Sequence, residues 1–385
     1  MNIKSLLLGS AAALIAVSGA RAADAVVVAE PEPAEYVKIC DVYGAGYFYI
    51  PGTETCLRIG GYVRYDIGAG DVGSFDGAWA RDKEDGEVND TWQKNARFTL
   101  KTWTGQETEL GTLKTYTETR FNFGNTRFSG GDGSYSGNAS NKDVSLNFAW
   151  IQLGGLRVGK DESAFDTFIG YAGNVIQDTL VPYGGFDTNV IQYYFDAGNG
   201  FSAVVSLEEG YGPYSIDSYV PHVVGGVKWT QGWGAISGVV AYDSAYEEIA
   251  GKVRLDVNVS NELSLWIMGG YGSDDNYNDS TWAVPAGGGL VASGRGMYKL
   301  WGGNWAVWGG GTYKFNEKTS FNVQASYDED ENLGIAANIA YDVVPGFTIT
   351  AEVDYLNAGS YPASNWTSAD KESNIGGILR FQRSF

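Results

Sequence analysis

Polar and apolar side chains alternate along residues 57–67, which give the clearest pattern in this chain. The odd positions are apolar or glycine, and the even positions include Arg58, Tyr62, Arg64 and Asp66. A period of two predicts an extended strand with one apolar and one polar face. The apolar face would point to a core in a soluble β-sandwich. In a large membrane barrel it would point to lipid, and the polar face would line water.

The same alternation recurs along the chain and predicts about sixteen strands. Most approach the roughly 9–11 residues that a tilted strand needs to cross a bilayer. An even number of strands places both termini on the same side of the membrane. The strands are expected around residues 57–68, 92–104, 111–123, 143–153, 155–161, 189–196, 200–208, 222–230, 233–243, 248–259, 262–272, 303–315, 319–328, 332–343, 346–356 and 373–385.

The connections between these strands alternate in length. Short turns such as Gly154-Gly155 and Gln231-Gly232 are expected at one end of the strands. Short turns at one end and long loops at the other are typical of membrane barrels, whereas a soluble sandwich has no reason to obey this rule. The connections on the long side are 69–91, 124–142, 162–188, 209–221, 273–302 and 357–372, together with two short ones at 244–247 and 329–331.

The connection at about 162–188 differs from the others because it is rich in Phe, Ile, Val, Leu and Tyr without a period of two. A connection of this length is either functional or disordered, and its apolar content argues against disorder. We therefore expect it to fold into the lumen of a barrel and to narrow a pore. The acids expected at this constriction are Asp161, Glu162, Asp166, Asp178 and Asp187.

Basic side chains lie on the polar faces of the first three strands. Opposite the acids of the loop, they would create a field across a narrow gap and so set the preference for ions. The alternative is that they are ordinary wall residues scattered along a wet lumen. The net charge of −20 favours a weak preference for cations. The bases expected on the pore wall are Arg58, Arg64, Arg97, Lys101, Lys114 and Arg120.

The first 22 residues have the features of a cleaved signal peptide. Lys4 supplies positive charge, residues 6–17 form a short apolar core, and Ala20-Arg21-Ala22 ends in the small-x-small pattern of a cleavage site. A membrane anchor is the weaker alternative, since this apolar run is too short to span a bilayer. The remaining chain divides into an acidic N-terminal lead-in at 23–55 and the barrel at 56–385.

Composition narrows the class of protein further. The 54 Gly, 25 Tyr and 12 Trp residues, with 9 Pro, suit many strands with tight turns and aromatic girdles. The acidic balance argues against nucleic acid as a partner, because phosphate binding needs a basic surface. Two cysteines in an exported chain predict one disulfide, Cys40–Cys56. With His222 as the single histidine, we expect no metal site, no cofactor and no catalytic residues.

Several stretches resemble the alphaproteobacterial porins of rhizobia and brucellae. They are YGAGYFYIPGTETCLRIGGYVRYD (residues 43–66) with the partner Cys40, LRVGKDESAFDTF (156–168) and the ending RFQRSF (380–385). The similarity extends over nearly the whole chain. It implies a trimeric outer-membrane porin of sixteen strands, with its third long loop folded inward and passive diffusion of small hydrophilic solutes and ions. The homotrimer is implied by this resemblance alone.

We therefore predict an all-β protein, a 16-stranded antiparallel transmembrane β-barrel with an inward-folded constriction loop, surrounded by outer-membrane lipid. Three alternatives remain. A substrate-specific sugar channel predicts saturable flux for one sugar. A barrel enzyme such as a lipase or protease would have to use His222. A soluble exported β-sandwich predicts that the alternate apolar face is buried in a core.

Overall fold

The structure is a computed structural model that describes residues 38–70, 72, 77–125, 138–273, 283–286, 289–292, 296–359 and 372–385. Contacts group Ile39–Phe385 into one compact unit, and Met1–Lys38 into another. The predicted signal peptide at 1–22 and residues 23–37 of the predicted lead-in lie outside the described residues.

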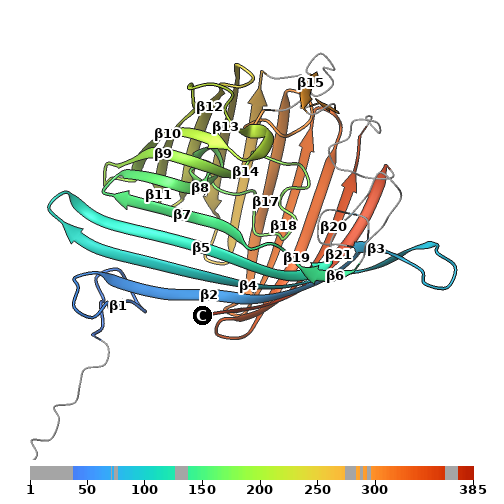
Figure 1. The fold of residues 1–385 in the computed structure, drawn as a ribbon, viewed down its shortest axis with the longest axis horizontal. Helices are drawn as coiled ribbons and strands as arrows, with labels where there is room; N and C mark the ends of the chain where they lie inside the picture. Colours follow the sequence, from blue (N-terminus) through green and yellow to red (C-terminus); the bar gives the residue numbers. More distant parts are fainter. Residues whose placement is uncertain are drawn as a thin grey trace, which may run out of the picture. The chain divides into compact units, whose positions relative to one another are not determined.

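Antiparallel strands close into one barrel, which confirms the predicted fold (Figure 1). Each strand of the wall pairs with its neighbours in the sequence, and β2 pairs with β21 to close the circle. The sixteen strands of the wall are β2 (Cys56–Gly70), β4 (Val88–Thr108), β5 (Gly111–Asn125), β7 (Ser145–Leu153), β8 (Leu156–Glu162), β9 (Asp187–Asp196), β10 (Phe201–Gly210), β11 (His222–Gln231), β12 (Gly234–Asp243), β13 (Glu248–Asn258), β14 (Leu263–Gly272), β17 (Trp305–Asn316), β18 (Thr319–Asp328), β19 (Leu333–Val344), β20 (Phe347–Asn357) and β21 (Ser373–Ser384).

The predicted alternation of faces is confirmed by solvent exposure along the strands. On β13, Ile249 and Val253 are 56% and 60% exposed, whereas Lys252 and Arg254 between and beside them are 1% and 8% exposed. A soluble sandwich would bury the apolar side chains and expose the charged ones. The inversion shows an apolar outer surface around a polar interior, as a membrane barrel requires.

Short turns and long connections alternate as predicted. For example, residues 109–110 and 345–346 form tight turns, whereas residues 211–221 and 163–186 form long connections at the other end. Three predicted loops also contain short strands, which corrects their description as loops throughout. Part of 69–91 forms β3 (Gly77–Arg81) and extends β4, part of 124–142 forms β6 (Ala139–Asn141), and part of 273–302 forms β15 (Ala283–Ala286) and β16 (Gly289–Ala292).

The long connection between β8 and β9 spans residues 163–186, and we call it the inserted loop. Glu162 and Asp187, which were expected within it, are instead directly paired terminal residues of the two strands. The loop begins with the short helix α2 (Ala164–Thr167), and the Ser163 side chain caps it by accepting from the N–H of Phe165. Within the described part of the chain, no helix is long and apolar enough to cross a membrane.

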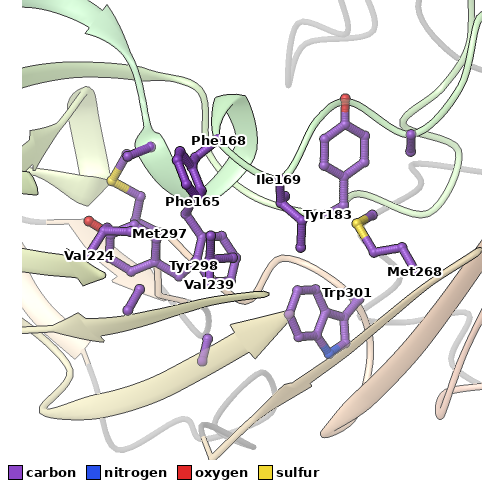
Figure 2. Packing of buried hydrophobic residues seen from close by; sticks show 14 of the residues in the cluster. Phe165, Phe168, Ile169, Tyr183, Val224, Val239, Met268, Met297, Tyr298 and Trp301 are labelled. Carbon is purple, nitrogen blue, oxygen red and sulfur yellow. The ribbon is translucent and has the colours of Figure 1, made fainter. Parts of the chain in front are cut away.

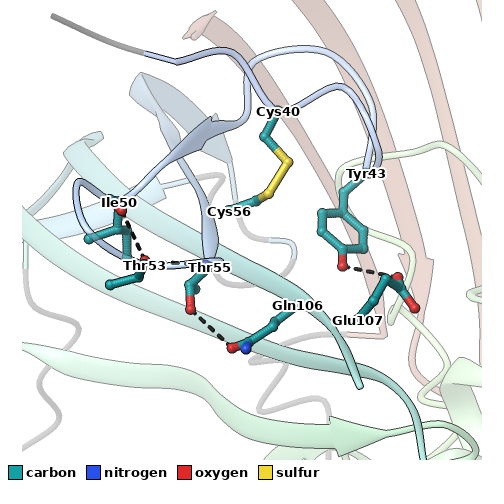
Figure 3. Close-up of a disulfide and its surroundings, with 8 residues drawn as sticks. All are labelled: Cys40, Tyr43, Ile50, Thr53, Thr55, Cys56, Gln106 and Glu107. Atoms are coloured by element: carbon teal, nitrogen blue, oxygen red, sulfur yellow. Dashed lines mark hydrogen bonds between the residues drawn. A yellow bond between two sulfur atoms is a disulfide. The ribbon is translucent and has the colours of Figure 1, made fainter. Parts of the chain in front are cut away.

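A disulfide joins Cys40 to Cys56, as predicted, and ties residues 39–55 to the start of the barrel (Figure 3). β1 (Phe48–Tyr49) pairs with the first residues of β2. The Tyr43 hydroxyl donates to Glu107 of β4 at 3.0 Å. A Cβ added to Gly105 would lie 2.6 Å from the Tyr43 ring, so the ring occupies the space beside this glycine. Residues 39–55 therefore pack on the wall at its short-turn end.

Candidate functional site

The inserted loop lies inside the barrel, because inward-facing side chains of the wall hold it along its length. At its start, the Glu208 carboxylate of β10 accepts from the Ser163 hydroxyl at 2.6 Å and from the Ala164 N–H at 2.9 Å. Further on, the indole N–H of Trp308 on β17 donates to the carbonyl of Val181 at 2.8 Å. These contacts confirm the predicted inward fold of this loop.

The tip of the inserted loop reaches strands that are distant from its ends in the sequence. The Glu352 carboxylate of β20 accepts from the N–H groups of Ile176 and Gln177, at 2.6 and 2.8 Å. The Asn338 amide of β19 donates both to Glu352, at 2.8 Å, and to the carbonyl of Asn174, at 3.1 Å. The loop leaves the wall between β8 and β9 and is fastened at β19 and β20, so it crosses the lumen.

A buried ion pair holds the middle of the loop. The Lys252 ammonium of β13 lies 2.6 Å from Asp166 Oδ1 and donates to the Tyr183 carbonyl at 2.8 Å, and both charged side chains are fully buried. Burial raises the pKa of Asp166, and the Lys252 ammonium opposes that rise. Asp166, expected among the acids of the pore, is therefore an anchor of the loop.

A second segment, residues 296–304, packs on the inserted loop inside the barrel. Figure 2 shows Met297 and Tyr298 beside Phe165, and Trp301 below Tyr183 and Met268. Met297, Tyr298 and Trp301 are at most 1% exposed. This segment belongs to the long connection 273–302, for which the sequence left open whether any part enters the lumen. Sequence alone gave no signal for its position beyond the apolar residues themselves.

Hydrogen bonds tie this second segment both to the inserted loop and to the wall. The Met297 carbonyl accepts from the Gly185 N–H at 2.8 Å, and the Met297 N–H donates to Asp243 at 2.8 Å. The Tyr298 hydroxyl donates at 3.0 Å to Glu208, the same carboxylate that binds the start of the inserted loop. Residues 296–304 thus link the inserted loop to β10 and β12.

Four of the six predicted bases gather on the wall opposite these anchors. On β2, β4 and β5, directly opposed residues share one face, and Arg64 lies opposite Arg97. Lys101 and Arg120 share the Glu118 carboxylate, at 3.1 and 2.7 Å. Arg97 donates to Asn122 at 2.8 Å. Directly opposed arginines repel each other unless acids lie nearby.

Two acids of the wall compensate this charge, and they were not among the predicted site residues. Glu118 is one, and Asp66 is the other: it lies 3.3 Å from Arg64 and accepts a two-pronged bond from Arg380 of β21, at 2.7 and 3.2 Å. The alternation on β2 placed Asp66 on the correct face. Its partner Arg380 lies 314 residues away, so only barrel closure could reveal the pair.

The remaining two predicted bases lie nearer the short turns. The Arg58 guanidinium covers the ring of Trp103, with 4.7 Å between its central carbon and the ring centre. Lys114 is exposed and lies in the row of Gly105 and Gln152. The structure therefore brings together Arg64, Arg97, Lys101 and Arg120, but separates Arg58 and Lys114 from them.

The predicted acids do not converge on one surface. Asp161 lies 2.7 Å from Arg157 on its own strand. Asp187 pairs with Lys160, and Glu162 accepts from the Tyr171 hydroxyl. Glu162 and Asp187 are directly paired at the ends of β8 and β9, and the Tyr171 contact holds Glu162 beside the inserted loop.

Two of these acids have further interactions that bear on a pore. The Arg120 guanidinium is among the charged groups that act electrostatically on Glu162. Asp178 of the loop accepts from the Tyr183 hydroxyl at 2.7 Å. Burial raises the pKa of Asp178 to about 6, although the Tyr183 hydrogen bond opposes the rise. Asp178 can therefore change its charge near neutral pH.

His222, which the enzyme alternative requires, is fully buried at the start of β11. Its Nδ1 accepts from the N–H of Ser244 at 3.0 Å, and Asp243 lies 3.3 Å from the same nitrogen. A catalytic triad needs the nucleophile and the acid on opposite ring nitrogens, whereas Nε2 lies 3.1 Å from the Tyr214 carbonyl. Among the described residues, no cluster of His, Cys, Asp and Glu could hold a metal ion.

Known proteins share both this sequence and this architecture. Porin Omp2b of Brucella suis biovar 1 and that of Brucella melitensis biotype 1 are each 51% identical to the chain over 395 aligned residues, with all of both chains covered. The outer membrane channel DcaP of Acinetobacter baumannii is 16% identical, with a TM-score of 0.59 over 88% of this chain and 99% of DcaP. A triple mutant of Rhodopseudomonas blastica porin is 12% identical, with a TM-score of 0.52 over 86% of this chain and 100% of its own.

The two solved structures share the fold of the barrel, and the Brucella proteins are similar in sequence to this chain along its whole length. The model of the porin subfamily matches residues 24–378, which include every strand of the wall except the end of β21. The chain therefore belongs to the porin subfamily, and it is an outer-membrane channel for passive diffusion rather than an enzyme.

Proposed function

We propose that solutes pass between the inserted loop and the wall formed by β2, β4, β5 and β21. The observation that supports this proposal is that the described anchors of the loop stand on strands away from β2, β4, β5 and β21. Its anchors Glu208, Lys252, Trp308 and Glu352 stand on β10, β13, β17 and β20. The bases of β2, β4 and β5 keep partly exposed side chains on the other side. Sieving by this gap would set the size limit for solutes.

We also propose that the charges along the gap, rather than a single binding site, set its preference for ions. On the wall, Asp66 and Glu118 are each shared between two bases. Glu162 and Asp178 supply negative charge from the side of the loop, while the charges of Asp161, Asp166 and Asp187 are paired. A weak preference for cations rests on the net charge of −20 for the whole chain.

The proposed working form is a homotrimer, exported by cleavage after Ala22. The trimer is supported by the family to which the chain belongs, and the cleavage by the small-x-small pattern at the end of the apolar run. Mass spectrometry of the mature N-terminus tests the cleavage. Cross-linking in detergent tests the trimer.

Planar-bilayer recording of the detergent-extracted protein tests the diffusion pore. We expect stable conductance steps in groups of three, with current proportional to salt concentration. A well-folded sample that inserts without conducting would contradict the proposal. Reversal potentials in a KCl gradient test the ion preference, and a sign that indicates anions would overturn the cation preference while leaving the pore intact.

A further inference from the structure

A row of aromatic and arginine side chains crosses the wall beside the proposed passage. Arg58, Trp103, Tyr116 and Trp150 are directly opposed residues on β2, β4, β5 and β7. The rings of Trp103 and Tyr116 are stacked at 5.4 Å, and those of Tyr116 and Trp150 lie 5.7 Å apart. We call these four residues the aromatic row.

The aromatic row faces the lumen and is thus distinct from a lipid-facing girdle. Directly opposed residues share one face of a sheet. The row continues from Trp150 through Gly159 and Val190 to Glu208, which binds the inserted loop inside the barrel. Outward-facing aromatic residues, such as Trp229 at 46% exposure, belong to the opposite face. Membrane anchoring therefore does not account for the aromatic row.

Polar groups with fixed orientations surround these rings. The Tyr116 hydroxyl donates to Glu118 at 2.7 Å. The Arg157 guanidinium lies between the rings of Trp150 and Tyr194, at 4.0 and 5.0 Å from their centres, and donates to Gln152 at 2.8 and 2.9 Å. Arg58 lies over Trp103, and Arg157 lies over Trp150. The row therefore offers a flat polar ligand partly exposed rings and ring edges beside planar hydrogen-bonding groups.

The aromatic row lies next to the charged part of the wall along the passage. Inward-facing neighbours on a strand are two residues, or about 7 Å, apart. Lys101 and Glu118 are therefore the next pair beyond Trp103 and Tyr116 on the long-loop side. A solute that passes the charged wall meets the aromatic row directly afterwards, and the row spans four strands. It is wide enough to contact successive rings of one chain-like solute.

We propose that the aromatic row is a binding track for neutral oligosaccharides made of pyranose rings. A pyranose presents C–H groups on its face, which pack against the exposed parts of aromatic rings, and hydroxyl groups on its edge, which bond to Arg, Glu and Gln. The track rests on the proposed passage along this wall. It makes the channel a diffusion pore with a preferred class of solute.

The charges beside the row favour a neutral ligand over an anion. Arg157 is paired with Asp161 at 2.7 Å, and Lys101 shares Glu118 with Arg120. An anion site would require bases without such partners, because a carboxylate must replace its hydration with charged donors. Acids already occupy donors of Arg157, Lys101 and Arg120, and the Arg58 guanidinium lies over the Trp103 ring. A hydroxyl group, by contrast, can bond to either partner of an ion pair.

The test is the block of ion current by maltohexaose in bilayer recordings of the full-length porin. We expect a saturable reduction of current in the wild type. In Trp103→Leu/Trp150→Leu, the half-blocking concentration should rise about tenfold or more, equivalent to about 1.4 kcal/mol. Trp229→Leu removes a ring from the outer face and should leave the block unchanged. Trp103→Tyr keeps a ring and should retain most of it.

The possible results distinguish failure of the binding track from failure of the diffusion pore. An equal block in the wild type and in the double variant would overturn the track, as would block by sodium benzoate without block by maltohexaose. Current without sugar in every variant shows that the barrel has folded. A wild type that carries no current at all would overturn the diffusion pore and the track together.

Discussion

At the scale of single residues, the same side-chain types have different roles on the two sides of the lumen. Lys252 and Asp166 are fully buried and hold the inserted loop, whereas Arg97 is partly exposed and bonds to the neutral Asn122. A buried pair is costly to break because the remaining charge stays without compensation. A partly exposed base faces the water of the passage, so its charge can attract or repel a passing ion. Burial thus separates anchors from pore charges.

Lys252→Met should loosen the inserted loop, because it leaves the Asp166 carboxylate buried without its cation. Removing one member of a buried ion pair costs about 3–5 kcal/mol, and here this loss would weaken the attachment of the inserted loop to the wall. We expect larger and noisier single-channel conductance, measured in planar bilayers, while the barrel itself remains folded.

The matched control for this change is Lys252→Met/Asp166→Leu, which removes both charges. Replacing both members of a buried ion pair by apolar residues is often neutral. The double variant should therefore be quieter than the single variant. Equal noise in the two would show that the ion pair does not fasten the loop.

Asp178 should make the ion preference depend on pH. Its pKa, raised by burial to about 6, means that the carboxyl becomes neutral as the pH falls through that value. The reversal potential should shift toward anions between pH 7 and pH 5, and Asp178→Asn should remove that part of the shift. An unchanged shift in the variant would assign it to other groups.

The Asp178 carboxyl should also make the stability of the folded protein depend on pH. The pKa of an Asp in the unfolded chain is about 3.9. Because the folded pKa is higher, the ionised form is the disfavoured one in the folded protein. The cost is therefore fully present above about pH 6 and is lost as the pH falls toward about 4. Asp178→Asn should raise the melting temperature more at pH 7 than at pH 4.

At the scale of elements, the constriction consists of two inserted pieces rather than one. The inserted loop supplies the narrowing, and residues 296–304 cover its back through Met297, Tyr298 and Trp301. Close packing of this kind resists displacement, because each apolar side chain fills the space left by others. The position of the gap therefore depends on a connection that is more than a hundred residues further along the chain.

The disulfide should stabilise the short-turn end of the barrel. Cys40 and Cys56 are separated by 16 residues, and closing a loop of this length in the unfolded chain is worth about 3 kcal/mol. Reduction should lower the melting temperature and free residues 39–55. Cys40→Ser/Cys56→Ser should melt like the reduced protein, and reductant should not lower its melting temperature further. A double variant as stable as the oxidised wild type would contradict this role.

At the scale of the whole molecule, the ion preference sums over charges that face each other across the gap. Arg97→Gln removes one base that bonds to Asn122, so no acid is left without its partner. A unit charge about 8 Å from an ion in water contributes roughly 0.5 kcal/mol, with opposite sign for a cation and an anion. The cation-to-anion permeability ratio should therefore rise about fivefold.

Arg383→Gln is the control for this experiment, because Arg383 pairs with Val63 on the outer face and donates to the Pro345 carbonyl. Its removal changes the net charge equally but lies outside the lumen. Equal shifts of the reversal potential in the two variants would mean that total charge, rather than placement, determines the preference.

The strands and their faces were predictable from the sequence because a period of two is a local signal. On β13, the alternation of Ile249 and Val253 with Lys252 and Arg254 gave both the strand and its orientation. The order of short and long connections was equally local. The helix α2 and the short strands within the long connections were missed, since they are too short to show a period.

The partners of each charge were not predictable, since they depend on register and closure across the whole barrel. The contacts of Glu352 with Ile176 and of Trp308 with Val181 span 176 and 127 residues. Sequence placed Asp166 in the inserted loop but could not show that Lys252 would neutralise it. The alternation also placed Arg64 and Arg120 on the polar face of their strands. It could not show that Asp66 and Glu118 would pair with them.

The pairing of β2 with β21 has a consequence for the order of assembly. Phe385, the last residue, exchanges two backbone hydrogen bonds of 3.0 Å with Gly61, near the start of the wall. Nine further residue pairs, from Tyr62–Ser384 to Gly70–Gly376, join the same two strands. Until β21 has been synthesised, every intermediate sheet has two unpaired edges, which invite association with other chains. Contacts between distant residues also form slowly, because the intervening chain must first be ordered. A nascent chain of this protein therefore needs protection of both edges until β21 is available, and deletion of β21 should lead to aggregation rather than to a smaller pore.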